Sequence, residues 1–258
     1  MMAPEHSRLR QVVLVADSNQ VIERALRAAI SLAVASRASL SGVFVENEDI
    51  LRAAQLPTAR EVGIASAQIR ALDISETQRA LHSQAERLRC ALAEVSEQRG
   101  LAWSFRVDRG RAYQHALDSL SQAVAAVLAP MPRAGQLAAL PLRAAMTGKV
   151  LCIVTTEPDD VRVIELAEHL AAPGEPIHLA SPGAPLTENA IAALAERSRR
   201  VGGRPPQIVP SLPALPQQLP LSIGMARYDA VLMRVGTLSV ARLVQLRASL
   251  TCPIVLTS

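Results

Sequence analysis

Short apolar runs alternate with amphipathic stretches along most of the chain. The first run, Val12 to Ala16, ends at Asp17-Ser18-Asn19, and the apolar positions after it recur at helical spacing: Ile22, Leu26, Ile30 and Ala33. A buried strand followed by a covering helix fits this pattern. A further extended segment, 39–46, completes a β-α-β unit, which predicts parallel strands joined by a right-handed helical crossover.

This pattern occurs twice in the chain. The segment Val13 to Ala33 aligns with Leu151 to Ala171 at a constant offset of 138 residues, with strand over strand and helix over helix. The extended segment 39–46 has its counterpart at 176–181. Such a repeat predicts an α/β protein built from two tandem doubly wound parallel-sheet domains, residues 9–147 and 148–258.

The remaining segments extend each copy toward five strands. In the first copy we expect a long helix up to Gly100, strands at 101–107 and 123–130, and a helix from Arg111 to Ser121 between them. The second copy has matching segments: a helix at 186–200, a strand at 206–211, a proline-interrupted helix up to Arg227, a strand at 228–234, a helix at 239–249 and a last strand at 252–258. The first copy lacks a fifth strand, because 131–148 is typical of a loop with a short helix. Its exposed sheet edge would need covering, for instance by another subunit.

The first copy also contains a long excursion from Asn47 to Leu72. We expect a short helix at 49–54 in it, and the excursion either covers a ligand crevice or packs as a plain flap. Asp73 and Glu76 then form the sequence pattern of a capping box. The apolar residues of the following helix recur every seventh position, which fits either a core-facing stripe or a dimer seam: Ile74, Leu81, Leu88 and Val95.

Composition narrows the functional classes. The chain has 258 residues, of which half are hydrophobic, and no apolar run approaches the length of a membrane helix, so we expect a cytoplasmic protein without membrane insertion. Aromatic residues make up 2%, the formal charge of +4 comes almost wholly from scattered arginines, and Lys149 is the one lysine, so nucleic acid is not an expected partner. Three separated cysteines, Cys90, Cys152 and Cys252, are typical of reduced, buried thiols.

Several of these features together resemble the universal stress protein family. They are the first strand ending in a relative of Asp-x-Ser at Asp17, the "GVFV" second strand, the long second helix, "RG" at Arg109-Gly110 and the final "CPIVL". The resemblance implies the doubly wound, adenine nucleotide alpha hydrolase-like fold, a homodimer, and an internal pseudo-dimer of the two copies. It also implies membership of either an ATP-binding or a non-ATP-binding group.

Nucleotide binding would use the first copy. The resemblance places Asp17 and Ser18, the backbone around Val43 and Val45, and the glycines Gly110 and Gly135 around ATP or another adenine nucleotide. The family's phosphate motif, Gly-x2-Gly-x9-Gly-Ser/Thr, is degenerate here, because Gly135 and Gly148 stand alone after the fourth strand. Asp17 is alternatively a turn or helix-cap residue. In the second copy Thr155 stands in its place, and Gly236-Thr237 is all that remains of the motif.

Other catalytic chemistry finds no support in the sequence. The dinucleotide, Walker A and nucleophile-elbow glycine motifs do not occur, and the five histidines lack the spacing of metal ligands: His6, His82, His115, His169 and His178. Asp159-Asp160 is expected to begin a helix. We therefore expect a non-enzymatic regulatory or stress-response protein that senses a small ligand near Asp17. The alternatives are an adenine-nucleotide hydrolase with Asp17 and Gly110 beside the nucleotide, and a module that binds a membrane transporter or kinase through the open edge of the first sheet.

Overall fold

The structure is a computed structural model that describes residues 10–17, 22–62, 68–131, 148–155, 160–183, 186–200, 207–208 and 228–258. The first half contains β1 (Gln11–Ala16), α1 (Ile22–Ala35), β2 (Ser39–Asn47), α2 (Glu48–Ala54), β3 (Arg60–Val62), β4 (Ile69–Ala71), α3 (Ile74–Gln98), β5 (Trp103–Gly110), α4 (Ala112–Ser119) and β6 (Ala125–Leu128). The second half contains β7 (Val150–Ile153), α6 (Val161–Glu168), β8 (Ile177–Ala180), α7 (Glu188–Arg200), β9 (Gln207–Ile208), β10 (Ala230–Arg234), α9 (Val240–Arg247) and β11 (Ile254–Thr257).

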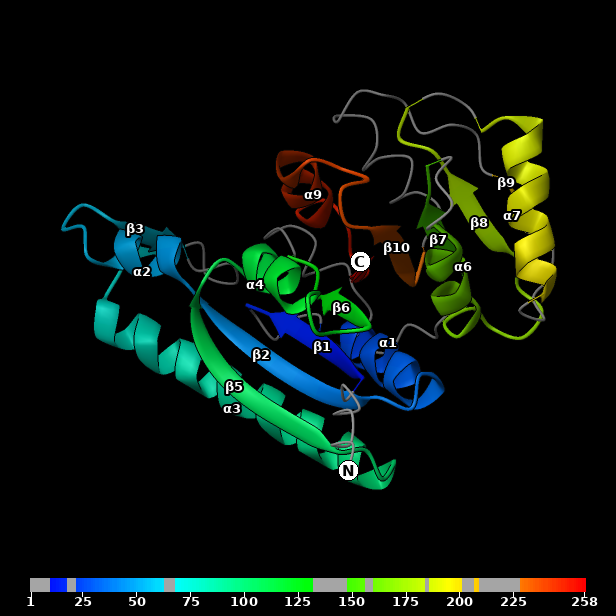
Figure 1. Ribbon diagram of the computed structural model, residues 1–258. Coiled ribbons are helices and arrows are strands. Elements are labelled where there is room, and N and C mark those ends of the chain that lie inside the picture. The colour runs from blue at the N-terminus through cyan, green and yellow to red at the C-terminus, as the bar shows by residue number, and fades with distance from the viewer. Residues whose placement is uncertain are drawn as a thin grey trace, which may run out of the picture.

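A single nine-stranded sheet runs through both halves in the order β5-β2-β1-β6-β11-β10-β7-β8-β9 (Figure 1). The four strands of the first half and the first four of the second half have the same internal order, with the third strand outermost, then the second, the first and the fourth. Within each half the neighbouring strands of this sheet are parallel. The α/β fold class expected from the sequence is therefore confirmed, whereas the boundary between two domains near residue 148 stays a prediction.

The two halves join through β11, the last strand of the chain. β11 pairs in parallel with β10 of its own half and antiparallel with β6 of the other half, with Val255 opposite Val127. Because β11 lies beside β6, it takes the place that a fifth strand of the first half would occupy. The expectation that this edge is exposed and needs another subunit is therefore wrong, since the chain covers it with its own C-terminal strand.

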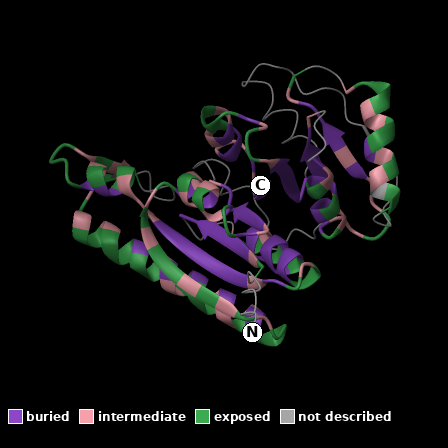
Figure 2. Cartoon of the chain, in the orientation of Figure 1, coloured by how far each residue is buried: buried purple, intermediate pink, exposed green. Residues whose placement is uncertain are grey.

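Helices cover both faces of the sheet, and its central strands are accordingly buried through most of their length, whereas the edge strand β5 contains no fully buried residue (Figure 2). On one face α1, α3, α6 and α7 contribute to a core with alternate strand residues such as Val12 and Leu14. On the other face α4 and α9 pack on the intervening residues, including Val13 and Val15. This two-layer covering explains why the strands read as continuous apolar runs in the sequence.

Helix α3 confirms the core alternative for its heptad positions. Leu81 and Leu88 are buried against the sheet, as are Ala85 and Leu92 beside them. At the start of α3 the Asp73 side chain accepts a hydrogen bond from the Glu76 backbone N–H at 2.8 Å, as the capping pattern predicts. The Glu76 carboxylate forms an ion pair with Arg70 of β4, with 3.3 Å between Oε2 and Nη1.

The excursion after β2 contains the expected short helix, α2, followed by a small hairpin of β3 and β4. Figure 1 shows this arm projecting beyond the end of β2, away from the main sheet. Four apolar side chains of the arm are substantially exposed: Ile50, Leu56, Val62 and Ile69. Three other expectations lie outside the described residues, namely the short helix within 132–147, the proline-interrupted helix within 209–227 and most of the strand at 206–211.

The three cysteines are free thiols, but they do not share one environment. Cys152 and Cys252 are buried, and Cys90 is exposed on α3. The expectation of three buried thiols is therefore wrong for Cys90, because it points away from the apolar stripe formed by Leu88 and Leu92. Burial raises the pKa of the Cys252 thiol to about 12 and raises the pKa of Cys152 further still.

Thiol labelling of the native chain is expected to show one fast and two protected cysteines. The thiolate is the reactive form, and burial disfavours it at Cys152 and Cys252. Ellman's reagent at pH 8 measures the rates, and Cys90→Ser should remove the fast phase while leaving the two slow ones. Rapid labelling of more than one thiol in the folded chain would contradict the burial of β7 and of the segment before β11.

Candidate functional site

The carboxyl ends of β1 and β6 form the natural ligand position of the first half. The chain proceeds from β1 outward to β2 and β5 on one side, and β6 lies on the other side of β1, so the connections diverge between these two strands. Ligands of open α/β sheets bind at such a switch point. Asp17 directly follows β1, and Ala129 directly follows β6.

An arginine from the second half occupies this switch point. Arg247, in the last turn of α9, donates from Nη1 to Asp17 Oδ2 at 2.8 Å and from Nη2 to Asp17 Oδ1 at 2.6 Å. Its Nε donates to the Ala129 carbonyl oxygen at 2.8 Å. Asp17 is 8% exposed and Arg247 is 4% exposed, so they form a buried bidentate pair rather than a surface contact.

The second half has an arginine–aspartate pair at its own switch point, between β7 and β10. Asp160 Oδ2 accepts from the backbone N–H of Thr155 at 2.6 Å and from its hydroxyl at 3.0 Å. Asp160 Oδ1 lies 3.7 Å from Nε of Arg234, the last residue of β10. Asp160 is the N-cap residue of α6 but makes no side-chain capping bond. The prediction that a helix begins here is confirmed, whereas the Asp160 carboxylate turns back to Thr155.

A second ion pair also crosses between the halves. Arg24 of α1 lies with Nη1 3.8 Å from Oδ1 of Asp229, which is almost fully buried just before β10. The other carboxylate oxygen of Asp229 accepts the backbone N–H of Gly148 at 2.7 Å. This contact lies at the amino end of β10, opposite the end that carries Arg234. The halves are thus held together by charged contacts at both ends of the strands as well as by β11.

The remaining candidate residues of the first half are spread along two strands. Val43 and Val45 are fully buried in β2, and their strand pairs with β1 on one side and β5 on the other. In the register Ala16 is opposite Phe44, so Val45 is level with Asp17, and Val43 lies deeper in the sheet. Gly110 ends β5 opposite Asn47, three residues further along than Phe44. Ser18 and Gly135 lie outside the described residues.

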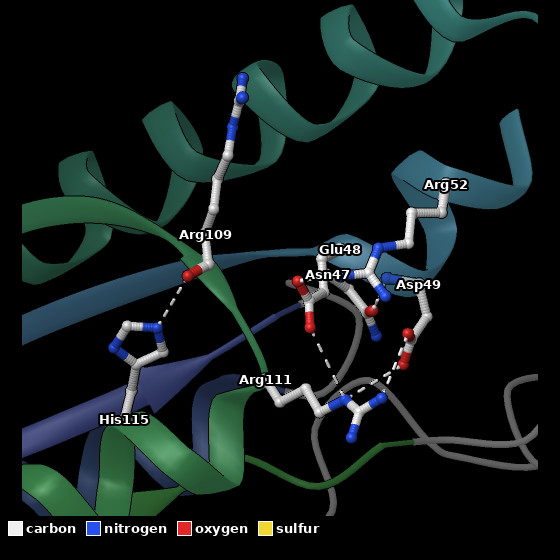
Figure 3. A network of polar contacts seen from close by, with 7 residues as sticks. All are labelled: Asn47, Glu48, Asp49, Arg52, Arg109, Arg111 and His115. Atoms are coloured by element: carbon white, nitrogen blue, oxygen red, sulfur yellow. Dashed lines mark hydrogen bonds and ion pairs between the residues drawn. The ribbon is translucent and has the colours of Figure 1, made fainter. Parts of the chain in front are cut away.

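Gly110 has a local structural reason for being glycine. Its φ is +138°, and a Cβ at this position would lie 3.1 Å from Nε2 of His115. The same His115 nitrogen is 3.1 Å from the Arg109 carbonyl oxygen, so the imidazole packs over the end of β5 (Figure 3). The His115 Nδ1 atom lies 3.5 Å from Asp108 Oδ2. These contacts favour a role for Gly110 in the turn from β5 into α4.

Charged residues link the excursion to this turn (Figure 3). Arg111 lies 3.4 Å from the Asp49 carboxylate and 3.9 Å from that of Glu48, both in the first turn of α2. Glu48 also binds Arg52 within the helix at 2.9 Å. Asn47 caps α2 by accepting from the Asp49 backbone N–H at 2.9 Å. The network therefore fixes α2 beside the end of β5, and its charges neutralise one another.

Metal binding and membrane insertion gain no support from the described part of the chain. Within it, His, Cys, Asp and Glu side chains do not gather in threes at a position suited to a metal ion. Among the same residues, no helix combines the length and apolarity that crossing a membrane requires.

Comparison with solved structures places the fold. A universal stress protein from Archaeoglobus fulgidus DSM 4304 matches with a TM-score of 0.51 over 96% of this chain and 96% of its own, at 10% sequence identity. The chain shares the fold of this protein. A protein of unknown function from Pseudomonas aeruginosa PAO1 covers 97% of this chain and 93% of its own at 12% identity, with a TM-score of 0.45. A universal stress family protein from Burkholderia pseudomallei covers 80% of this chain and 99% of its own. Its sequence identity is 17% and its TM-score is 0.28.

Sequence comparison gives no match. No protein-family model matches the chain, and no curated protein matches it. At 10% identity the structural similarity establishes the fold alone.

Arg247 is the site residue that sequence reasoning missed. The pattern of α9 does contain a signal, because Leu243, Leu246, Arg247 and Leu250 are spaced as one buried helix face. An arginine on such a face needs a buried acceptor. The sequence alone could not identify Asp17 as that acceptor, since 230 residues separate the two.

Proposed function

We propose that the chain is a non-enzymatic regulatory or stress-response module of the universal stress type, with two tandem copies that work without an adenine nucleotide. The observation that carries this proposal is the buried pairing of Arg247 with Asp17 at the first switch point. The shared strand order of the halves, and the match to the Archaeoglobus protein along nearly its whole length, support the tandem arrangement.

The pairing leaves Asp17 poorly available to a ligand. The resemblance would use this carboxylate to accept hydrogen bonds from an adenosine, but both of its oxygens already accept from Arg247. A ligand that took over one oxygen would have to displace a buried guanidinium that also binds Ala129. A guanidinium that stays buried without its partner destabilises the folded chain by about 3–5 kcal/mol. The Arg234–Asp160 contact gives the second switch point a similar internal pair.

Thermal-shift measurements with ATP, ADP and AMP test the proposal. A ligand present at a hundred times its Kd stabilises a protein by about 2.7 kcal/mol, which raises the Tm of a chain of this size by about 5–10 °C. We expect no saturable rise with any of the three nucleotides at millimolar concentration. We also expect no release of phosphate from ATP above the rate without protein.

Two results would contradict the proposal in different ways. A saturable rise in Tm that Asp17→Asn abolishes would support ligand sensing at the first crevice, and Asp118→Asn, on the exposed side of α4, is the matched control. Steady production of ADP would support the hydrolase alternative. The transporter or kinase alternative loses its proposed contact, because the edge at β6 is paired with β11.

A further inference from the structure

Strand β5 forms an edge of the nine-stranded sheet. Among the described residues it pairs with β2 alone, over its full length of eight residues from Trp103 to Gly110. Figure 1 shows β5 running along the margin of the sheet, with α3 on one side of it. At the opposite edge, the described part of β9 is two residues long. A long unpaired edge is a template for pairing with another strand.

The backbone of β5 presents a regular set of outward hydrogen-bonding groups. The Ala102 carbonyl oxygen accepts from the Leu40 N–H at 2.9 Å, so Ala102 faces β2. Because backbone groups alternate between the two sides of a strand, the even-numbered residues of β5 bond to β2 and the odd-numbered ones face outward. The outward groups therefore belong to Trp103, Phe105, Val107 and Arg109, of which the Arg109 carbonyl oxygen already lies 3.1 Å from His115 Nε2.

Val107 is unusual among the apolar residues of this set because its side chain is exposed as well. It lies on the same face of β5 as Trp103 and Phe105, which pack against the core that α3 covers. Yet 46% of Val107 is exposed. The two charged residues beside it, Arg106 and Asp108, point to the opposite face and contact each other at 2.7 Å.

This short sequence is complementary to itself in one antiparallel register. When two copies of β5 pair about a two-fold axis at Val107, Arg106 of each copy lies opposite Asp108 of the other, and Val107 lies opposite Val107. Arg106 and Asp108 then occupy non-hydrogen-bonded pairs, in which opposite side chains approach most closely. The two Val107 residues exchange both of their backbone hydrogen bonds.

The neighbouring registers lack this complementarity. Centring the axis on Arg106 places two arginines opposite each other, and centring it on Asp108 places two aspartates opposite each other. Centring it on Phe105 leaves Arg106 opposite Ser104. Like charges directly opposite destabilise a strand pair, whereas opposite charges stabilise it.

From this charge pattern we infer that the chain forms a two-fold homodimer by antiparallel pairing of β5 with β5 of a second copy, centred on Val107. The dimer extends the sheet across both copies. A contact built on one strand pair lies at the small end of stable interfaces, so the dimer dissociates on dilution.

Sedimentation velocity over a dilution series tests the inference directly. We expect the wild-type chain to shift reversibly between monomer and dimer. Val107→Pro removes the outward N–H without breaking the ladder to β2, and it should weaken the dimer about thirtyfold through the two lost hydrogen bonds. Val107→Lys should weaken it by a similar factor. Val34→Lys is the matched control, because Val34 on α1 is also 46% exposed and should leave the dimer unchanged.

A pair of charge variants tests the register. Arg106→Asp and Asp108→Arg each place like charges opposite each other in a homodimer, so each variant alone should be monomeric. An equimolar mixture should form a heterodimer, because the first variant then carries a carboxylate at both positions and the second carries a guanidinium at both. Mixing cannot repair contacts within a chain, so recovery on mixing identifies the contact between chains.

Each outcome decides the matter. A wild-type chain that stays monomeric at all concentrations overturns the inference, as does a dimer that persists in both Val107 variants. Single charge variants that dimerise as well as the wild type overturn the register. Melting curves of all variants establish that they remain folded.

Discussion

Replacing Gly148 by alanine is expected to destabilise the chain by about 4 kcal/mol. A Cβ at this position would lie 2.0 Å from the Cβ of Ala172 and 2.5 Å from its backbone nitrogen. The two segments cannot easily separate, because Ala172 N–H donates to the Gly148 carbonyl at 3.1 Å and Gly148 N–H donates to Asp229. Gly148 also has a φ of +72°, which disfavours any side chain.

Urea denaturation of the wild type and of Gly148→Ala measures this loss. Gly100→Ala provides the control, since Gly100 has a similar φ of +62° but no atom within 4 Å of its added Cβ. The Gly100→Ala variant should lose about 1 kcal/mol of unfolding free energy, from backbone strain alone. Equal losses in the two variants would show that the approach of Ala172 contributes nothing.

Replacing Arg247 by methionine should lower the free energy of unfolding by about 3–5 kcal/mol, because it leaves the Asp17 carboxylate buried without its partner. The Ala129 carbonyl loses its hydrogen bond in the same step. A double variant, Asp17→Leu with Arg247→Met, should recover much of the loss, since apolar residues can replace a buried ion pair at little cost. Chemical denaturation of the two single variants and the double variant gives the coupling between the positions.

Arg89→Met is the matched control for the ion pair. Arg89 binds Glu86 on the surface of α3 at 2.9 Å, with 44% of its side chain exposed. Surface pairs of this kind contribute little to stability, because water screens their charges. If Arg247→Met were no more destabilising than Arg89→Met, the buried pair would not be what holds α9 over the first half.

The local elements of this fold could be predicted well because each carries its own pattern. The buried strands β1, β7 and β10 are largely continuous apolar runs, and α3 is marked by its cap at Asp73 and its core face at Leu81 and Leu88. These signals lie within a few residues of one another. The repeat at an offset of 138 residues also predicted matching elements in the two halves, and the halves share their strand order.

The features that could not be predicted depend on contacts distant in sequence. The pattern "CPIVL" identifies β11 as a strand, but it pairs with its two neighbours, β6 and β10, through backbone hydrogen bonds that carry no sequence signature. Arg247 is visible as a charge on an apolar face, whereas its acceptor Asp17 is not. The candidate ligand residue was thus recognisable as a polar group at a strand end, while the group that binds it comes from the other half.

The position of β11 has a consequence for how the chain is made. The sheet of the first half is incomplete at β6 until Ile254 to Thr257 have been synthesised, and these residues leave the ribosome long after Leu128 has done so. During synthesis the nascent first half therefore exposes an apolar strand edge that its own later segments must close. We therefore expect a chaperone to protect the edge of β6 until β11 has been synthesised.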